Sequence, residues 1–142
     1  MKVGVEQDAS EGHRRIRILI ADDHPVVRKM VRSTLEQVPR FEVCGEAHDG
    51  AEAIKEARKL RPDVVVLNLN MPVLNGFAAA REIKTTIPES AIIILSSEVD
   101  HRLIDEAKKI GVRAYVAKTK TGEELVKAIE AAVTHGDFVL LK

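Results

Sequence analysis

The sequence predicts an α/β protein built on a doubly wound, five-stranded parallel sheet of the (βα)5 type. From about residue 15 onward, short apolar runs alternate five times with amphipathic stretches. Three of the runs are nearly continuous in Ile, Val and Leu, as expected for parallel strands that helices cover on both faces. Five repeats of strand then helix imply right-handed crossovers, with helices on both sides of one sheet.

The strands are predicted from the apolar runs at residues 16–21, 41–47, 63–67, 91–95 and 113–117. The helices are predicted from apolar residues at helical spacing, which in the first helix are Val27, Met30, Val31 and Val38, and in the last Leu125, Val126, Ile129, Ala132 and Val133. Pro25 suits the first turn of a helix, and Gly111 follows the fourth helix as a C-terminal cap would.

Composition indicates a globular chain without an obvious nucleic-acid or membrane partner. The 142 residues are the length of one domain, and 45% of them are hydrophobic and 31% charged. Lys plus Arg equals Asp plus Glu at 22 each, so no basic footprint for nucleic acid is present. No apolar run approaches the ~20 residues that cross a bilayer, and the N-terminus lacks a signal-peptide core. With Cys44 expected as a core residue, these features predict a cytoplasmic protein.

Both ends of the chain lie outside the predicted repeats. Residues 1–14 are expected to be a flexible lead-in, 15–136 the folded domain, and 137–142 a tail or the start of a truncated linker. The basic residues His13, Arg14, Arg15 and Arg17 are expected to be solvated, with an anion patch as the alternative. The apolar tail Phe138, Val139, Leu140 and Leu141 either docks on the domain or begins a linker.

Polar residues stand at the ends of four predicted strands. Asp22 and Asp23 follow the first, Asn68 the third, Ser96 the fourth and Lys118 the fifth. Ligands of doubly wound sheets bind beyond the carboxyl ends of the strands, so these side chains are expected to form one site. Two adjacent carboxylates repel each other unless a cation offsets the charge, and oxygen ligands suit Mg²⁺. Asp is also a common helix N-cap, so the pair by itself is a weak signal.

From Arg15 to about Gly136 the chain resembles a response-regulator receiver domain of two-component signalling. The segments Ile-Ala-Asp-Asp-His-Pro at 20–25 and Asn-Met-Pro at 70–72 look most like receivers of LuxR-type transcriptional regulators. The resemblance implies the flavodoxin-like strand order 2-1-3-4-5 and a regulatory module that is not an enzyme. It also implies a histidine kinase or phosphotransfer protein as partner and a weak homodimer as a further association. The output domain that it implies, DNA-binding in LuxR-type regulators, is expected to be absent from this chain.

The resemblance assigns roles to individual residues. Asp22 and Asp23 match the acidic pair that holds Mg²⁺, and the backbone carbonyl of Asn70 matches a third ligand. Ser96 and Lys118 match the hydroxyl and ammonium groups that bind the acyl phosphate, and Tyr115 with Ser96 matches the conformational switch. The partner surface would be the fourth and fifth helices with the strand around Tyr115.

Asn68 occupies the position of the phosphate-accepting aspartate. A carboxamide oxygen carries no full negative charge, so it is a poor nucleophile toward phosphorus and a weaker support for Mg²⁺. Its NH₂ group can donate hydrogen bonds, for instance to Asp23. The chain is therefore predicted not to be phosphorylated as it stands. Asn68 is either natural, in a pseudo-receiver that works as a phosphate-independent interaction module, or an introduced block.

Two other classes of doubly wound protein fit the motifs less well. An aspartate phosphatase would place its nucleophile in an Asp-x-Asp arrangement, whereas His24 follows Asp22 and Asp23 directly. A nucleotide or flavin protein would carry a glycine-rich phosphate loop, and the loop after the first predicted strand has no glycine.

Overall fold

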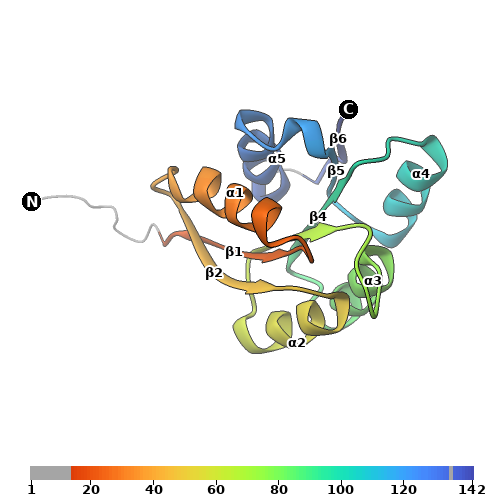
Figure 1. Ribbon diagram of the computed structural model, residues 1–142, viewed down its shortest axis with the longest axis horizontal. Coiled ribbons are helices and arrows are strands. Elements are labelled where there is room, and N and C mark those ends of the chain that lie inside the picture. Colours follow the sequence, from red (N-terminus) through yellow and green to blue (C-terminus); the bar gives the residue numbers. More distant parts are fainter. Residues whose placement is uncertain (1–13, 135) are drawn as a thin grey trace, which may run out of the picture.

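The computed structural model describes residues 14–134 and 136–142. Within them, one parallel sheet of six strands has the order β2-β1-β3-β4-β5-β6 (Figure 1). The elements are β1 Ile16–Ala21, α1 Pro25–Glu36, β2 Phe41–Ala47, α2 Gly50–Leu60, β3 Val64–Asn68, α3 Gly76–Thr86, β4 Ala91–Ser96, α4 His101–Ile110, β5 Ala114–Ala117, the 3₁₀ helix η1 Lys118–Lys120, α5 Glu123–Thr134 and β6 Val139–Leu141. The predicted order 2-1-3-4-5 is confirmed, and β6 adds a strand that the sequence analysis did not include.

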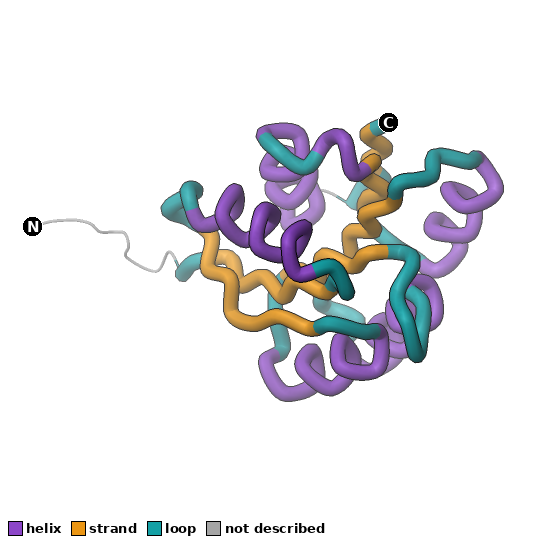
Figure 2. The backbone as a smooth tube through the Cα atoms, viewed as in Figure 1, coloured by secondary structure: helices purple, strands orange, loops and turns teal. Residues whose placement is uncertain are grey.

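The sheet separates two apolar cores. Leu19 and Val65 pack on the side of α2, α3 and α4, whereas Ile18 and Val66 pack on the side of α1 and α5. The helical layers on the two faces are visible in Figure 2. Because β3 is central and covered on both faces, its four apolar residues are fully buried, which explains its unbroken run of Val and Leu. No helix in the described part of the chain is long and apolar enough to cross a membrane.

Side-chain caps start the helices on one face of the sheet. Asp49, Asn75 and Asp100 accept hydrogen bonds from backbone N–H groups in the first turns of α2, α3 and α4. Each such cap is worth about 1 kcal/mol. Gly111 ends α4 with φ 96°, in the left-handed region that favours glycine. The caps fix where the loops after β2, β3 and β4 end, and these loops border the carboxyl edge of the sheet.

Two predicted details differ from the structure, and a third, which the sequence left open, is decided by it. Met30 is 57% exposed, because α1 turns Val31 and Leu35 into the core instead. Cys44 is only half-buried; its thiol donates to the carbonyl of Ile18, and burial raises its pKa. The tail docks: Val139–Leu141 pairs with β5 through residues Ala114–Val116, so the sheet extends past the predicted boundary at residue 136. Without β6, β5 would be an edge strand, and this edge lies open to pairing with an apolar segment.

The predicted lead-in, including His13, lies outside the described residues except for Arg14. Arg14, Arg15 and Arg17 each make hydrogen bonds to the domain, although Arg14 and Arg15 remain exposed. Arg14 binds the carboxylate of Asp63 through both terminal nitrogens, at 2.6 and 2.8 Å. Arg15 donates to the carbonyl of Phe41, and Arg17 donates to that of Leu60. The expectation of solvated side chains therefore holds for Arg14 and Arg15, which are exposed, whereas Arg17 is partly buried.

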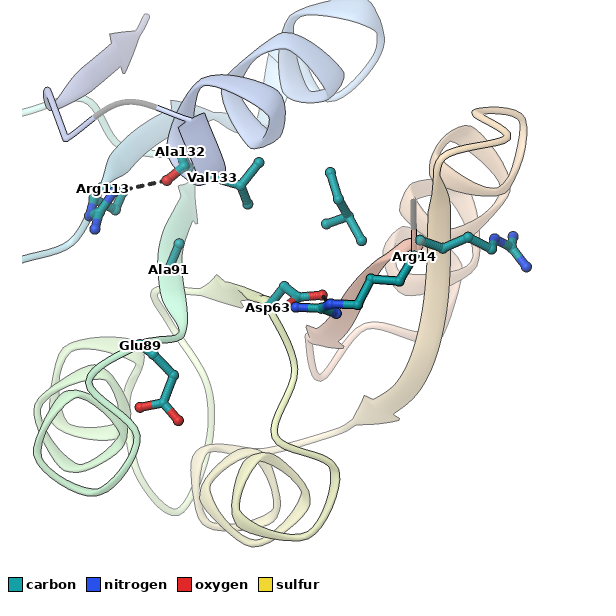
Figure 3. Close-up of a pocket in the computed structure, with 9 residues that line it drawn as sticks. Arg14, Asp63, Glu89, Ala91, Arg113, Ala132 and Val133 are labelled. Atoms are coloured by element: carbon teal, nitrogen blue, oxygen red, sulfur yellow. Dashed lines mark hydrogen bonds and ion pairs between the residues drawn. The ribbon is translucent and has the colours of Figure 1, made fainter. Parts of the chain in front are cut away.

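Arg14 and Asp63 border an open pocket of about 310 Å³ at the amino ends of the strands (Figure 3). It lies at the opposite edge of the sheet from the polar strand ends. Asp63 also accepts a hydrogen bond from the backbone N–H of Arg17 at 2.8 Å. The carboxylate thus joins the start of β1 to the start of β3.

Asp63→Asn is expected to lower the free energy of unfolding by about 1–2 kcal/mol at neutral pH, because hydrogen bonds to a charged group contribute that much. Burial raises the pKa of Asp63, but the bonds from Arg14 and Arg17 outweigh it and hold the pKa below its ordinary value. A lowered folded-state pKa contributes stability above the unfolded pKa of about 4, and this contribution is lost as the pH falls through the folded value.

Urea unfolding at pH 7 and near pH 3 measures this effect. The difference in free energy of unfolding between the wild type and Asp63→Asn should be smaller at the lower pH. Glu89→Gln is a matched control, because Glu89 and Arg61 are both exposed and 3.4 Å apart; it should change stability by less than about 0.5 kcal/mol. An equal difference at both pH values would contradict a stabilising role for the ionised carboxylate of Asp63.

Candidate functional site

The polar strand ends meet at the carboxyl edge of the sheet. Strands β1, β3, β4 and β5 are neighbours in that order, so their ends lie side by side. Asp22 directly follows β1, Asn68 and Ser96 are the last residues of β3 and β4, and Lys118 directly follows β5. Asn68 and Ser96 were predicted to lie just beyond their strands, whereas each is the last paired residue of its strand. Pairing orients both side chains more firmly than a loop would.

The amide nitrogen of Asn68 lies among three oxygens. It is 2.8 Å from the backbone carbonyl oxygen of Asn70, 3.1 Å from Oδ1 of Asp23 and 3.4 Å from Oδ1 of Asp22. The NH₂ group has two hydrogens, so it can donate one hydrogen bond to each of the two nearer oxygens. Asn68 is 2% exposed, and an unsatisfied polar group there would be costly. The side chain is therefore held by the same oxygens that the resemblance assigns to a metal.

Asp22 is the most enclosed charge of the site, at 2% exposure. Its Oδ1 accepts the backbone N–H of His24 at 2.9 Å. Among the described residues its Oδ2 accepts no hydrogen bond of good geometry, but Nζ of Lys118 lies 3.3 Å away. We assign this contact as an ion pair, because a buried carboxylate needs a countercharge. Lys118 and the Asn68 amide together offset the repulsion between Asp22 and Asp23.

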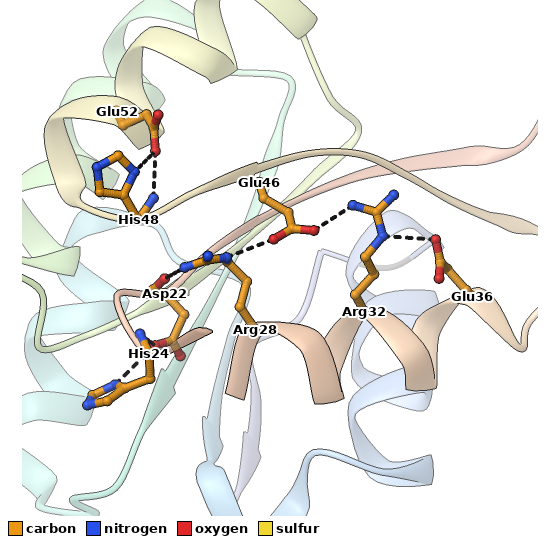
Figure 4. A network of polar contacts seen from close by, with 8 residues as sticks. All are labelled: Asp22, His24, Arg28, Arg32, Glu36, Glu46, His48 and Glu52. Atoms are coloured by element: carbon orange, nitrogen blue, oxygen red, sulfur yellow. Dashed lines mark hydrogen bonds and ion pairs between the residues drawn. The ribbon is translucent and has the colours of Figure 1, made fainter. Parts of the chain in front are cut away.

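Two further residues support Asp22 and were not singled out from the sequence. Nδ1 of His24 lies 3.2 Å from Oδ1 of Asp22 and 3.3 Å from Oδ1 of Asp23. Arg28, one turn further along α1, donates to the backbone carbonyl of Asp22 at 2.6 Å and to Glu46 at 2.7 Å (Figure 4). The sequence signal for Arg28 was weak, since it consisted only of its spacing from His24 and of a glutamate, Glu46, near the end of a predicted strand.

Glu46 is held by two arginines. Burial raises its pKa, but hydrogen bonds from Arg32 and Arg28 outweigh burial, so the pKa is lowered. Glu46 lies on β2 and both arginines lie on α1. The network therefore fastens α1 over the ends of β1 and β2, close to Asp22.

The loop after β3 is packed tightly against the strand end. The N–H of Gly76 donates to the carbonyl of Leu69 at 2.7 Å. A Cβ added to Gly76 would lie 2.6 Å from the backbone oxygen of Asn68. Within this loop Val73 has φ 70°, an unusual conformation for a β-branched residue, and its side chain is 78% exposed. The close approach of α3 returns the loop toward β3 and brings the carbonyl of Asn70 to Asn68.

Ser96 and Tyr115 both contact the loop after β4. The hydroxyl of Ser96 accepts the N–H of Glu98 at 3.0 Å, and the hydroxyl of Tyr115 donates to the carbonyl of Glu98 at 2.6 Å. Tyr115 is fully buried, and burial raises its pKa more than the nearby hydroxyl of Ser96 lowers it. These two residues therefore hold one loop from two strands, although neither makes a described contact with Asn68.

The oxygens around Asn68 suit a hard divalent cation in chemistry. Asp22, Asp23 and the carbonyl of Asn70 are the kinds of ligand that Mg²⁺ takes. Asp22, Asp23 and His24 also place one donor atom each within 4.8 Å of one another. Asn68, however, presents N–H groups to these oxygens. A cation at this point requires the amide to turn its oxygen inward, so the ligand set fits the ion only after that change.

Comparison with known proteins identifies the family. Residues 18–130 match the family described as the response regulator receiver domain. The transcriptional regulatory protein LiaR of Bacillus subtilis (strain 168) is 37% identical over 117 residues, which are 82% of this chain and 56% of LiaR. Protein CcdB of the same organism is 32% identical over 119 residues, 84% of this chain and 98% of CcdB. A solved LuxR-family response regulator from Aurantimonas sp. SI85-9A1 superposes with TM-score 0.83 and 34% identity, covering 88% of this chain and 89% of that one.

These matches agree with the motifs at 20–25 and 70–72. The family match covers well over half of the chain, and the relatives are LuxR-type response regulators. The chain spans about half the length of the first curated relatives it matches, at 53% and 56%. Receiver domains hold Mg²⁺ at an acidic site, and Asp22, Asp23 and His24 form an acidic cluster here. The chain belongs to the response regulator receiver domain family of two-component signalling, with LuxR-type regulators as its relatives.

Proposed function

We propose that this chain is a regulatory receiver domain that does not accept a phosphoryl group as it stands. Asn68 carries the proposal, because it stands at the end of β3, where the resemblance expects the acceptor aspartate. Attack on phosphorus needs an anionic oxygen, and the carboxamide has none. Its nitrogen faces Asp23 and the carbonyl of Asn70. The side chain therefore acts as a donor within the site.

The remaining residues take the roles that the resemblance assigns. Asp22, Asp23 and the carbonyl of Asn70 would hold Mg²⁺, which would offset phosphoryl charge when bound. The 3.3 Å contact of Lys118 with Asp22 supports a place for its ammonium group at the same point. Ser96 would bind a phosphoryl oxygen, and Ser96 with Tyr115 would form the switch through Glu98.

Magnesium binding is proposed to be weak. Asn68 supplies one negative charge fewer than aspartate would. A unit charge about 4 Å from a second one is worth roughly 4 kcal/mol at an effective dielectric of 20, before desolvation offsets much of it. The inward-facing amide hydrogens add a further cost, because the amide must first turn.

The chain would act by protein contacts and not as an enzyme. A histidine kinase or phosphotransfer protein would be one partner, and an output domain, DNA-binding in LuxR-type regulators, another. A weak homodimer and a cytoplasmic location are part of the same proposal. The contact surface would lie on α4 and α5, with β6 in place of β5 at the sheet edge between them.

A natural pseudo-receiver, working as a phosphate-independent interaction module, is the second candidate. The three contacts of the Asn68 amide are compatible with it, because they hold the site together without a ligand. An introduced asparagine in an ordinary receiver would give the same local geometry. The codon at position 68 of the source gene distinguishes the two origins.

Incubation with acetyl phosphate and Mg²⁺ tests the proposal directly. Intact-protein mass spectrometry should show no increase by one phosphoryl group. Stable, stoichiometric labelling of any strand-end residue, or of His24 beside them, would overturn the proposal.

A further inference from the structure

The C-terminal strand β6 lies on the open edge of β5 (Figure 1). The strands are parallel, with Ala114 beside Val139, Tyr115 beside Leu140 and Val116 beside Leu141. The N–H of Val139 donates to the carbonyl of Arg113 at 2.9 Å. Paired residues on neighbouring strands point to the same face of a sheet, so Leu140 is the β6 residue on the side of Tyr115.

The two leucines of β6 lie on opposite faces of the sheet. Leu140 packs against the core that contains Tyr115, on the side of α4. Leu141 packs against the other core, on the side of α5. Phe138, just before the strand, also joins the first core, and Nζ of Lys108 on α4 lies 5.3 Å from its ring centroid. The tail thus packs between β5 and α4, with the ring of Phe138 beside Lys108.

Tyr115 is held at both ends by these contacts. Its hydroxyl donates to the carbonyl of Glu98 in the loop after β4, and its backbone lies beside Leu140. The ring is fully buried although β5 would be the edge of the sheet without β6. Leu140 is the β6 residue that pairs with Tyr115 and packs on the same side of the sheet as its ring.

We propose that β6 is a latch on Tyr115, with Leu140 as the positioning residue that keeps the ring buried. The inference rests on the proposed function in one respect, the role of Tyr115 as a switch. Tyr115 stays against Glu98 while β6 is paired, and release of β6 frees it to turn outward. Movement of the loop after β4 is thereby coupled to the C-terminal end of the chain.

The chain carries its own probe for this coupling. Tyr115 is the single tyrosine and there is no tryptophan, so intrinsic fluorescence reports on this ring alone. Quenching by acrylamide, which is uncharged and unaffected by Lys108, measures how often the ring is accessible. In the full chain, Leu140→Ala should raise the quenching constant about twofold or more, because local opening becomes more frequent.

Leu141→Ala is the matched control. It removes the same atoms from the same strand but on the opposite face, and it should leave the quenching constant near that of the wild type. Leu140→Ile should restore the wild-type value if packing against the ring is the cause. If Leu140→Ala unfolds, Leu140→Val and Leu141→Val are compared instead. Leu140→Val should then have the larger quenching constant of the two, by a smaller margin than expected for the alanine variants.

Equal quenching in the two members of the pair would overturn the proposal. No rise in either variant would mean that β6 does not limit access to the ring, and an equal rise in both would mean that Leu140 is not the residue that keeps it buried. The measurement needs neither phosphoryl donor nor metal. Labelling of the wild type by acetyl phosphate would therefore refute the proposed function without changing the quenching order. Equal quenching would refute the latch and leave the argument from Asn68 untouched.

Discussion

Asn68→Asp is expected to turn a chain that acetyl phosphate does not label into one that carries close to one phosphoryl group per molecule. The change supplies the anionic oxygen that attack on phosphorus needs, at the end of β3 beside Asp22 and Asp23. Lys118 is already at the site, through its contact with Asp22. Intact mass after incubation with and without a chelator measures the effect, and labelling should require Mg²⁺.

Asn75→Asp is the matched control for this replacement. Asn75 caps α3 from the same loop, where its side chain accepts the N–H of Ala78 at 3.0 Å. Aspartate caps a helix about as well as asparagine, so this variant should fold normally and remain unlabelled. Labelling of Asn75→Asp would show that any new carboxylate near the site is enough.

The same Asn68→Asp variant should be less stable than the wild type without metal. It loses the amide donors to Asp23 and Asn70 and adds a third carboxylate to a repelling pair, a loss of about 2–3 kcal/mol. Mg²⁺ should raise the unfolding midpoint of the variant again, because a ligand that binds only the folded state stabilises that state. A variant that Mg²⁺ stabilises but acetyl phosphate does not label would favour a true pseudo-receiver. A midpoint that Mg²⁺ leaves unchanged would mean that Asp22 and Asp23 are structural.

Gly76→Ala is expected to lower the free energy of unfolding by about 3 kcal/mol or more, the upper end of the cost of forcing extra atoms into a close-packed site. The added methyl group would lie 2.6 Å from the backbone oxygen of Asn68 and 2.9 Å from Cα of Leu69. Both are backbone atoms, so no side-chain rotation relieves the overlap. Either α3 or the end of β3 must move.

Chemical denaturation of Gly76→Ala and Gly122→Ala measures this cost. Gly122 precedes α5, and a Cβ there would have nothing within 4 Å. Its replacement should change stability by less than about 0.5 kcal/mol. Similar losses in both variants would indicate a general cost of replacing glycine and would remove the special role of the contact between Gly76 and Asn68.

The sequence by itself determined the sheet and the side of it on which the site lies. A central strand that is covered on both faces is apolar along nearly all of its length, so the runs at β3 and β4 were recognisable without long-range information. Parallel strands end at one edge, so Asp22, Asn68 and Lys118 were predicted to meet, and the structure brings them together. The identity of residue 68 is also read from the sequence alone. It is the basis for proposing that the chain does not accept a phosphoryl group, because an amide is not a carboxylate in any fold.

The tertiary structure alone decided which contacts complete these elements. The strand β6 has three residues, too few for local preference to specify, and it forms because β5 offers an open edge. Arg28 reaches Asp22 and Glu46, and Arg14 reaches Asp63, through folding that brings distant segments together. Met30 and Val31 were both predicted on the apolar face of α1, and only the placement of α1 on the sheet decides that Val31 is buried and Met30 exposed. Likewise, the direction of the Asn68 amide depends on where Asp22, Asp23 and the carbonyl of Asn70 converge, since hydrogen bonds between residues on different elements exist only once those elements have packed.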